Sequence, residues 1–397
     1  MSTASTEHNP YVNEPDPNRT AEESVRHFAD DVYGRPPAEH VAMRWHEVRE
    51  TTLPDDSLRR QVVLELATEK DKLAITLLVH LPPIASRGER GAPAFLGMNF
   101  RGNHTTTEDS DVLDLTEPED PSHGDPLSYD ELKERFEIPF PRGAQANRWD
   151  YPTVAARGYA NITWSYVQLS PDTADIFARG PHKLFHDTDT DSREPSDWGS
   201  IGMWAWTMSR VLDALVAGMV PEVDPTTVIA HGHSRLGKTA LWAAATDQRF
   251  AAAISNNSGA MGAALSRPVG ETPTVLAEVR PHWFARRFSE IVLAGDPLPV
   301  DQPELIAAIA PRPVYVASAS EDTWADPEGE FLAWQQASAA WDGGTEATAG
   351  EFPEPGTVLQ PDGVPLGYHL RPGPHSVEAF DWAAWLDWAD RWVRPRS

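Results

Sequence analysis

The stretch Val228–Ala240, VIAHGHSRLGKTA, joins a short apolar run to a serine flanked by glycines and then to a helix-like segment. A strand, tight turn and helix in this order lift the hydroxyl of Ser234 above a sheet and aim the helix N-terminus at a bound carbonyl. Gly232 and Gly237 permit the tight turn and close helix–strand packing. The usual elbow is G-x-S-x-G, and here the second glycine comes one residue later. By itself the stretch leaves two interpretations open, a nucleophile and an ordinary polar turn.

The rest of the chain alternates strand-like and helix-like segments. Apolar, strand-like runs occupy residues 61–81 (two runs around a charged turn at 69–72), 93–99, 159–166, 228–230, 251–255 and 314–319, and helical periodicity covers 201–220, 238–245 and 377–393. This alternation predicts an α/β fold, a three-layer αβα sandwich with a mostly parallel central sheet. Ligands of such sheets bind beyond the carboxyl ends of the strands, so residues directly after strands are the candidates for chemistry.

The composition along the chain also predicts its domain organisation. Residues 1–40 are polar and proline-rich, and we expect a poorly ordered N-terminal arm that docks near 32–37. Residues 41–397 contain no repeat and no linker rich in glycine or serine, which predicts a single catalytic domain.

Composition excludes several classes of partner and site. The 397 residues include 60 acidic and 33 basic side chains, a formal net charge of −27. Nucleic acid and anionic membranes select basic surfaces, so we expect neither as a partner. Without cysteine the chain has no disulfide, thiolate nucleophile or cysteine zinc site. No apolar run reaches the about 18 residues of a membrane helix. As written the sequence shows no signal peptide and predicts a cytoplasmic protein, or a secreted one if a leader was removed.

Chain order supports the nucleophile interpretation of Ser234. In the fold with this elbow, the serine is followed along the chain by an acid and then a histidine. The strand at 314–319 runs directly into Glu321 and Asp322, and His375 stands in the Pro-Gly loop RPGPHS before the last helix. These positions suit a carboxylate that fixes an imidazole and an imidazole that takes the serine proton.

The motif GHSRLGK resembles the GCSRxGK signature of the glucuronoyl esterases, carbohydrate esterase family 15. The similarity continues in FRGNHT, WGSIGMWAWTMSRVLDAL, NNSGAMGAALSRPVGET, EDTWADPEGEF and GPHS, and it covers roughly residues 90–393. The resemblance implies an α/β-hydrolase that cleaves esters between the 4-O-methyl-glucuronate of xylan and lignin alcohols. It departs at His233, where the family has cysteine, and at SYVQLSPD, where the family usually reads GD-I.

The resemblance also implies roles for individual residues. Ser234 would be the nucleophile and His375 the general base. The family places the triad carboxylate after either of two strands; one position is Asn257 here, which cannot be an anion, so Asp322 is expected, with Glu321 as the near alternative. Further roles fall on the oxyanion-stabilising Arg235 and on the glucuronate contacts Lys238, Glu271 and Trp324.

Other polar and aromatic residues have simpler interpretations. We expect His231, His233 and His104 to be packed or hydrogen-bonded, and the tryptophans at 382, 385, 388 and 392, near helical spacing, to fill the core. Asp187, Asp189 and Asp191 alternate as calcium ligands can, but the glycine and closing glutamate of an EF-hand are missing, so a solvated loop is expected.

The sequence thus predicts a serine esterase with no metal and no organic cofactor. Its partner would be a glucuronate ester. The alternatives are an acetyl(xylan) esterase or broad carboxylesterase with the same triad, and a catalytically silent binding protein with the same fold. We expect a monomer, although nothing in the sequence fixes the oligomeric state.

Overall fold

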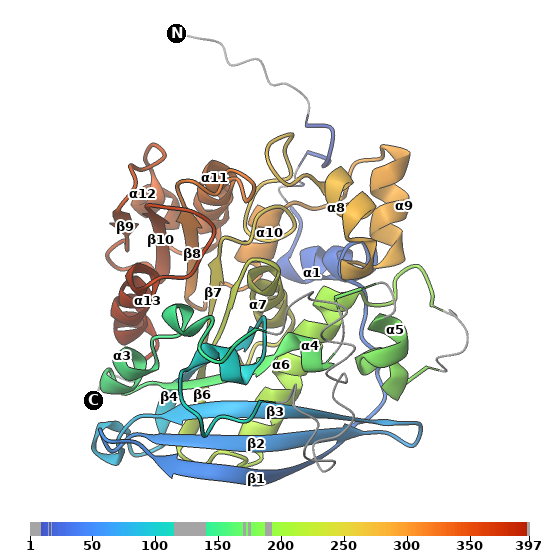
Figure 1. The fold of residues 1–397 in the computed structure, drawn as a ribbon. Coiled ribbons are helices and arrows are strands. Elements are labelled where there is room, and N and C mark those ends of the chain that lie inside the picture. Colours follow the sequence, from blue (N-terminus) through green and yellow to red (C-terminus); the bar gives the residue numbers. More distant parts are fainter. Residues whose placement is uncertain are drawn as a thin grey trace.

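The computed structural model describes residues 9–14, 16, 18–114, 140–169, 172–173, 176–186 and 193–394. Within these residues the strands form one ten-stranded sheet in the order β1-β2-β3-β5-β4-β6-β7-β8-β10-β9 (Figure 1). The strands are β1 (Ala42–Thr52), β2 (Leu58–Ala67), β3 (Lys72–Leu81), β4 (Ala92–Asn99), β5 (Ala160–Ser165), β6 (Val223–His233), β7 (Ala252–Asn256), β8 (Val314–Ala319), β9 (Thr357–Leu359) and β10 (Leu366–Arg371). From β5 to β10 every neighbouring pair is parallel, whereas β1, β2 and β3 extend the sheet antiparallel and β9 closes it antiparallel.

Helices cover both faces of this sheet (Figure 1). The longer ones are α1 (Ala21–Asp31), α6 (Ser200–Val216), α7 (Arg235–Thr246), α9 (Arg286–Ala294), α11 (Pro327–Ala337) and α13 (Ala379–Trp392). The shorter ones are α3 (Tyr151–Ala156), α4 (Tyr166–Leu169), α5 (Ile176–Arg179), α8 (Pro273–Val279), α10 (Gln302–Ala307) and α12 (Gly344–Thr348). The predicted three-layer, mostly parallel architecture is therefore confirmed.

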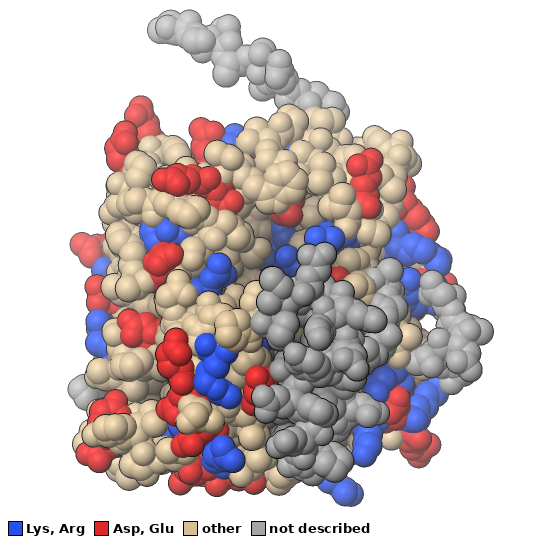
Figure 2. Space-filling model, in the orientation of Figure 1, with Lys and Arg blue, Asp and Glu red and all other residues tan. Residues whose placement is uncertain are grey.

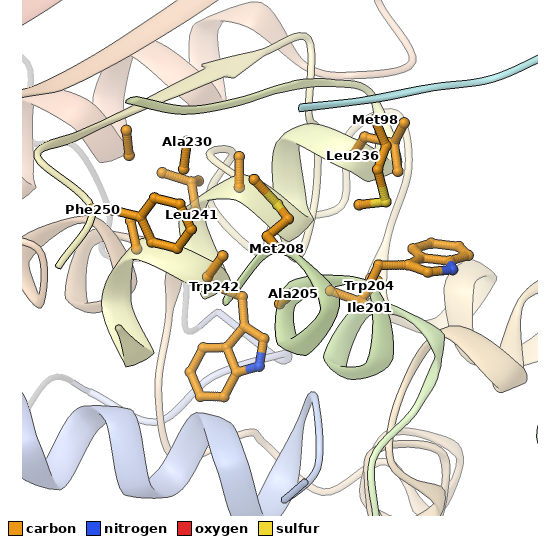
Figure 3. Close-up of a cluster of buried hydrophobic side chains, with 14 of the residues drawn as sticks. Met98, Ile201, Trp204, Ala205, Met208, Ala230, Leu236, Leu241, Trp242 and Phe250 are labelled. Atoms are coloured by element: carbon orange, nitrogen blue, oxygen red, sulfur yellow. The ribbon is translucent and has the colours of Figure 1, made fainter. Parts of the chain in front are cut away.

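Strand alternation divides the apolar side chains between two cores. In β4, Leu96 belongs to the larger core and Phe95 to the smaller one, and in β8 the same division separates Val316 from Tyr315. Successive side chains of a strand point to opposite faces, so the two cores lie on opposite sides of the sheet. Figure 3 shows part of the larger core, where Met208 of α6 lies beside α7.

The smaller core explains the tryptophan-rich C-terminal helix. Trp382, Trp385 and Trp388 of α13 are each at most 1% exposed and pack against Ile229 and Tyr315. Trp392 is partly buried against the same cluster. The expectation that these tryptophans fill the core is confirmed.

The N-terminal segment differs from the expected poorly ordered arm. Helix α1 begins with a capping box between Thr20 and Glu23, which satisfies two otherwise unpaired backbone N–H groups. Phe28 and Tyr33 are fully buried in the larger core, and the Tyr33 hydroxyl donates to Met261 O at 2.7 Å. Residues from α1 onward are thus packed on the rest of the fold, because two aromatic side chains anchor a stretch whose composition is otherwise polar and proline-rich. The domain boundary at residue 40 remains a prediction.

Charged side chains cover much of the surface. On the face in Figure 2, carboxylates and the side chains of lysine and arginine are interspersed, both at the edges and towards the middle. Among the helices that the structure describes, none is both long and apolar enough to cross a membrane.

Candidate active site

Ser234 lies between the end of β6 and the start of α7. Its backbone has φ 57° and ψ −131°, a conformation that a residue with a side chain rarely adopts. The amide N–H of Ser234 donates to Asn256 O at 2.8 Å and thereby ties the turn to β7. A Cβ atom at Gly232 would lie 2.0 Å from Leu236 O, so only glycine fits there. The turn at Ser234 is therefore sharp and strained, although Gly237, the second glycine of the elbow, comes one residue later than usual.

His375 and Asp322 meet at the ends of β10 and β8. His375 Nδ1 lies 2.5 Å from Asp322 Oδ2, and Asn257 Nδ2 donates to the same oxygen at 2.9 Å. Because a carboxylate can only accept, Nδ1 carries the proton and Nε2 of the neutral imidazole is left with a lone pair. Burial would raise the pKa of Asp322, but the hydrogen bond from His375 and the attraction of the imidazole when it is protonated outweigh burial and hold the pKa below its ordinary value.

The alternative acid, Glu321, lies apart from this pair. Its side chain is exposed, and its backbone N–H donates to Gly373 O at 3.0 Å. Among the described residues, no hydrogen bond joins the Glu321 side chain to His375, and none joins Ser234 Oγ to His375. Hydrogen bonds of catalytic groups are often formed only once substrate is bound.

Arg235, the residue after the serine, pairs with an acid that sequence reasoning missed. Its Nη1 forms an ion pair with Asp172, and its guanidinium lies 4.8 Å from the Trp283 ring centroid. Asp172 also interacts with His282 Nε2 at 2.8 Å and accepts from Trp283 Nε1 at 2.6 Å. Burial opposes ionisation of Asp172, but these donors and Arg235 hold its pKa well below the ordinary range. The Nε atom of Arg235 is buried and has no hydrogen-bond partner in the described part of the chain.

Lys238, one helical turn after Ser234, is 1% exposed and has all three ammonium donors matched. Nζ donates to Ser258 O and Ala260 O at 2.5 Å each and to Glu271 Oε2 at 2.6 Å. Glu271 N donates to Trp324 O at 2.7 Å, and the Trp324 side chain is 54% exposed. The structure therefore brings the three predicted sugar-binding residues together. In this arrangement Lys238 fixes the Glu271 carboxylate.

A buried polar network supports the loop that carries His375. Arg371, at the end of β10, donates to Pro372 O at 2.8 Å, to Pro374 O at 2.7 Å and to Ser376 O at 3.1 Å. Its Nε lies 3.0 Å from Asp381 Oδ2, and Asp381 is fully buried. The guanidinium thus holds backbone carbonyls on both sides of His375. No sequence pattern marks this contact, because it joins a strand end to α13.

The same network fixes the histidine before the serine. Asp381 Oδ1 accepts from Asn256 Nδ2 at 3.2 Å, so Asn256 Oδ1 faces His233 Nδ1 at 2.6 Å, which must carry the proton. Burial, followed by repulsion from the imidazole of His375 when it is protonated and from the charge of Arg148, holds the pKa of His233 well below its ordinary value. The His233 and His375 ring centroids are 4.3 Å apart. His233 is therefore a neutral ring packed against the candidate base.

The other histidines and the aspartates singled out in the sequence form no part of this site in the described residues. His231 is 6% exposed and packs edge-on against Phe95, and His104 is 2% exposed with Nε2 3.1 Å from Phe140 O. Both are packed or hydrogen-bonded, as expected. Asp187, Asp189 and Asp191 lie outside the described residues. The part of the chain that the structure describes contains no group of three or more acidic or histidine side chains placed to hold a metal.

A second missed carboxylate, Glu330 of α11, ties the loop after β7 to β8. Its Oε1 accepts from Ser258 N at 2.7 Å and Gly259 N at 3.0 Å, and its Oε2 accepts from Ser318 Oγ at 2.6 Å. Burial raises the pKa of Glu330 to about 8, although these donors oppose the shift. In the sequence Glu330 is one acid among many after EDTWADP, with no pattern that marks it as buried.

Comparisons of the sequence with known proteins show similarity to carbohydrate esterases. A family model described as glucuronyl esterase of fungi matches residues 137–343. Carbohydrate esterase MZ0003, from an unknown prokaryotic organism, is 38% identical over 375 residues, which are 91% of this chain and 82% of that protein. The 4-O-methyl-glucuronoyl methylesterase of Hypocrea jecorina is 33% identical over 151 residues, 36% of this chain and 33% of its own length.

Solved structures give the same result over most of the chain. A glucuronoyl esterase from Solibacter usitatus is 32% identical with a TM-score of 0.79, covering 94% of this chain and 92% of its own. A promiscuous esterase of carbohydrate esterase family 15 from a marine bacterial metagenome is 34% identical with a TM-score of 0.78, covering 96% of this chain and 97% of its own.

Proposed function

Because the chain belongs to the glucuronoyl esterase family, we propose that it hydrolyses esters of glucuronic acid with Ser234 as nucleophile. The observation that carries this proposal is the 2.5 Å contact between His375 and Asp322, formed at the ends of strands that follow the Ser234 elbow in the chain. The ester linkages between glucuronoxylan and lignin alcohols are the proposed natural substrates.

In the proposed reaction, Ser234 Oγ attacks the C6 carbonyl carbon of the glucuronate ester while Nε2 of His375 takes the hydroxyl proton. The C–O bond to the alcohol then breaks, and the alcohol leaves with the proton from His375. Water attacks the glucuronoyl ester of Ser234, with His375 again as base, and releases the free acid and the serine. Asp322 keeps the imidazole in the required tautomer and stabilises its charged form.

The negative charge that develops on the carbonyl oxygen needs donors in a dry site. Arg235 supplies two candidates, its backbone N–H at the start of α7 and its unpartnered Nε. The ion pair with Asp172 and the Trp283 ring hold the guanidinium in place, so the charge needs little rearrangement when the oxyanion forms. Arg235 is therefore proposed as the oxyanion-stabilising residue.

Recognition of the uronate is proposed to fall on Glu271 and the exposed indole of Trp324, with Lys238 holding the Glu271 carboxylate. A carboxylate accepts hydrogen bonds from two sugar hydroxyls, and an indole offers a flat apolar face with one donor. Lys238 is given the supporting role because its Nζ already donates to three acceptors within the protein.

The test compares initial rates on benzyl glucuronate and on an acetyl ester of similar leaving-group quality, with wild type and Ser234→Ala. We expect strong preference for the uronate ester and loss of both activities in the variant. Equal rates on the two esters would favour a broad carboxylesterase, and no turnover of either by the folded wild type would favour a silent binding protein. Arg235→Lys, which keeps the charge but not the planar fork, should lower kcat more than it raises KM.

A further inference from the structure

Asp172 belongs neither to the proposed triad nor to the proposed sugar contacts, yet it lies beside Arg235. Its side chain is 11% exposed, and its two oxygens divide their contacts. Oδ2 forms the ion pair with Arg235, whereas Oδ1 accepts from Trp283 Nε1 at 2.6 Å and faces His282 Nε2 at 2.8 Å. Because a carboxylate only accepts, that nitrogen of His282 carries the proton. The carboxylate is therefore fully engaged within the protein and is held against the guanidinium.

Arg235 and Asp172 form a pair without net charge. Although burial opposes ionisation, the contacts of Asp172 hold its pKa well below the ordinary range, so the carboxylate stays negative. The Arg235 side chain is 24% exposed and remains open to a ligand. The attraction between a lone cation and an anion falls with distance as 1/r, whereas that of two adjacent opposite charges falls more steeply. The pair therefore acts on an oxygen in direct contact and attracts a distant anion only weakly.

The charges of the described residues around Arg235 and the triad also balance. The cations are Arg101, Arg148, Arg235, Lys238 and Arg371, and the acids are Asp172, Glu271, Asp322, Glu378 and Asp381. Glu330, with a pKa of about 8, is largely protonated at neutral pH. Arg280 lies 5.7 Å from the Trp283 ring centroid, but it is exposed and solvent screens its charge. Loss of the Asp172 charge would therefore leave one positive charge in excess, beside Ser234.

The proposed reaction changes the charge of its ligand. The ester has no charge at C6, the tetrahedral intermediate has a negative charge on one oxygen, and the acid product is a carboxylate at neutral pH. An unbalanced guanidinium beside C6 would bind that product more tightly than the ester and would retain it. Interactions that are stronger in the transition state than with substrate or product favour turnover. A balanced guanidinium supplies such an interaction, because it acts mainly in contact.

We propose that Asp172 sets the preference of the site between the neutral ester and its anionic product, by cancelling the charge of Arg235 in the ground state. Asp172 is then a specificity-determining residue that acts through Arg235 and touches no reacting atom. The inference rests on the proposed hydrolysis of uronate esters and deepens it. The site would accept uronic acid derivatives that are uncharged at C6 and would release free acids.

The experiment measures binding without turnover, by saturation-transfer difference NMR titrations of the full chain. The two probes are methyl β-D-glucuronoside with a free carboxylate and its C6 amide, which share the sugar ring and differ in charge. We expect wild type to bind the carboxylate no more tightly than the amide. Asp172→Asn should bind the carboxylate about tenfold more tightly and leave the affinity for the amide unchanged. High ionic strength should reduce this gain.

Two further variants separate the effect of charge from that of structure. Asp213→Asn is the matched control, because Asp213 pairs with Arg249 at 2.6 Å beyond the C-terminal end of α7, away from Ser234. It should bind both probes as wild type does. The double variant Asp172→Asn with Arg235→Gln restores the charge balance and should return the affinity for the carboxylate to about the wild-type value. Thermal unfolding verifies that each variant is folded.

Several results would overturn the inference. Wild type that binds the carboxylate at least tenfold more tightly than the amide would do so, and this measurement needs no variant. Unchanged carboxylate affinity in a folded Asp172→Asn protein, a gain that persists in the double variant, or absence of saturable binding of both probes would also contradict it. Failure of the proposed function is detected separately, as absence of benzyl glucuronate hydrolysis by wild type.

Discussion

Nδ1 of His375 lies 2.5 Å from Oδ2 of Asp322, although Asp322 and the neighbouring Glu321 follow the same strand. The two acids point to different environments: Asp322 is 5% exposed and also accepts from Asn257, whereas Glu321 is exposed. Two acids that are adjacent in sequence after β8 thus differ in environment: Asp322 is the buried partner of the imidazole, and Glu321 is a surface carboxylate.

Replacement of this acid tests its proposed role. Asp322→Asn should lower kcat by roughly 10³- to 10⁴-fold, because an amide does not fix the required tautomer or stabilise the imidazolium. Glu321→Gln, the matched control, should retain near wild-type kcat on benzyl glucuronate. A nearly silent Asp322→Asn together with a crippled Glu321→Gln would reverse the assignment.

The tight elbow makes a prediction about stability. Gly232→Ala should lower the free energy of unfolding by about 3 kcal/mol or more, because the new methyl group would lie 2.0 Å from Leu236 O. Gly350→Ala, where no atom lies within 4 Å of the added Cβ, should change it by less than about 0.5 kcal/mol. Urea unfolding followed by circular dichroism measures both. Equal stabilities of the two variants would contradict the steric argument.

The engaged ammonium of Lys238 predicts non-additive effects on specificity. Glu271→Gln and Lys238→Met should each lower the ratio of kcat/KM for benzyl glucuronate to that for the acetyl ester, by about tenfold. The double variant should be little worse than either single one, because both changes disable the same carboxylate. Independent, additive losses would show instead that Lys238 contacts the sugar itself.

Arg371 is predicted to position the base without touching substrate. Arg371→Met removes three hydrogen bonds to the His375 loop, and we expect kcat to fall by about 10²-fold with little change in KM. Arg371→Lys keeps a charge beside Asp381 and should recover part of kcat. Stopped-flow rates and thermal unfolding separate this effect from loss of the fold. A folded Arg371→Met enzyme with wild-type kcat would exclude the positioning role.

Glu330 predicts a pH dependence of stability. Its pKa is about 8 in the native state, against an ordinary value of 4.5, so between these pH values the native state holds a proton that the unfolded state has lost. The stabilising contribution is therefore complete below pH 4.5 and is lost as pH rises through 8, a change on the order of 5 kcal/mol. Glu330→Gln should flatten this slope. Urea unfolding at pH 5, 6.5 and 8 compares the two proteins, and identical slopes would contradict the shift.

The central strands were predictable because their burial is complete. Every residue of β4, β7 and β8 is buried, so each reads as an uninterrupted run of apolar or small residues. Strand β1 was missed because most of its residues are exposed and its sequence mixes charged, polar and apolar side chains. Strand β10 was missed because it buries His369 and Arg371, two polar residues whose partner Asp381 lies in α13.

The residues of the candidate site also fall into those that could be predicted from the sequence and those that could not. Ser234, Asp322 and His375 could be found because strand ends and chain order constrain them. Asp172 could not, because its contact with Arg235 spans 63 residues, and the link between Asn256 and Asp381 spans 125. In a chain with 60 acidic residues, a carboxylate gives no indication in sequence that it is buried.

The attachment of Ser234, Asp322 and His375 to three separate strand ends has a consequence for redesign. Strands β6, β8 and β10 belong to one continuous hydrogen-bonded sheet, so their spacing does not depend on the intervening loops. Exchange of the loop at residues 265–272, which carries Glu271 but spares Asn257 and Trp283, would therefore alter which ester is accepted while the proposed triad stays in register. Ester selectivity could then be changed without moving the groups proposed to break the bond.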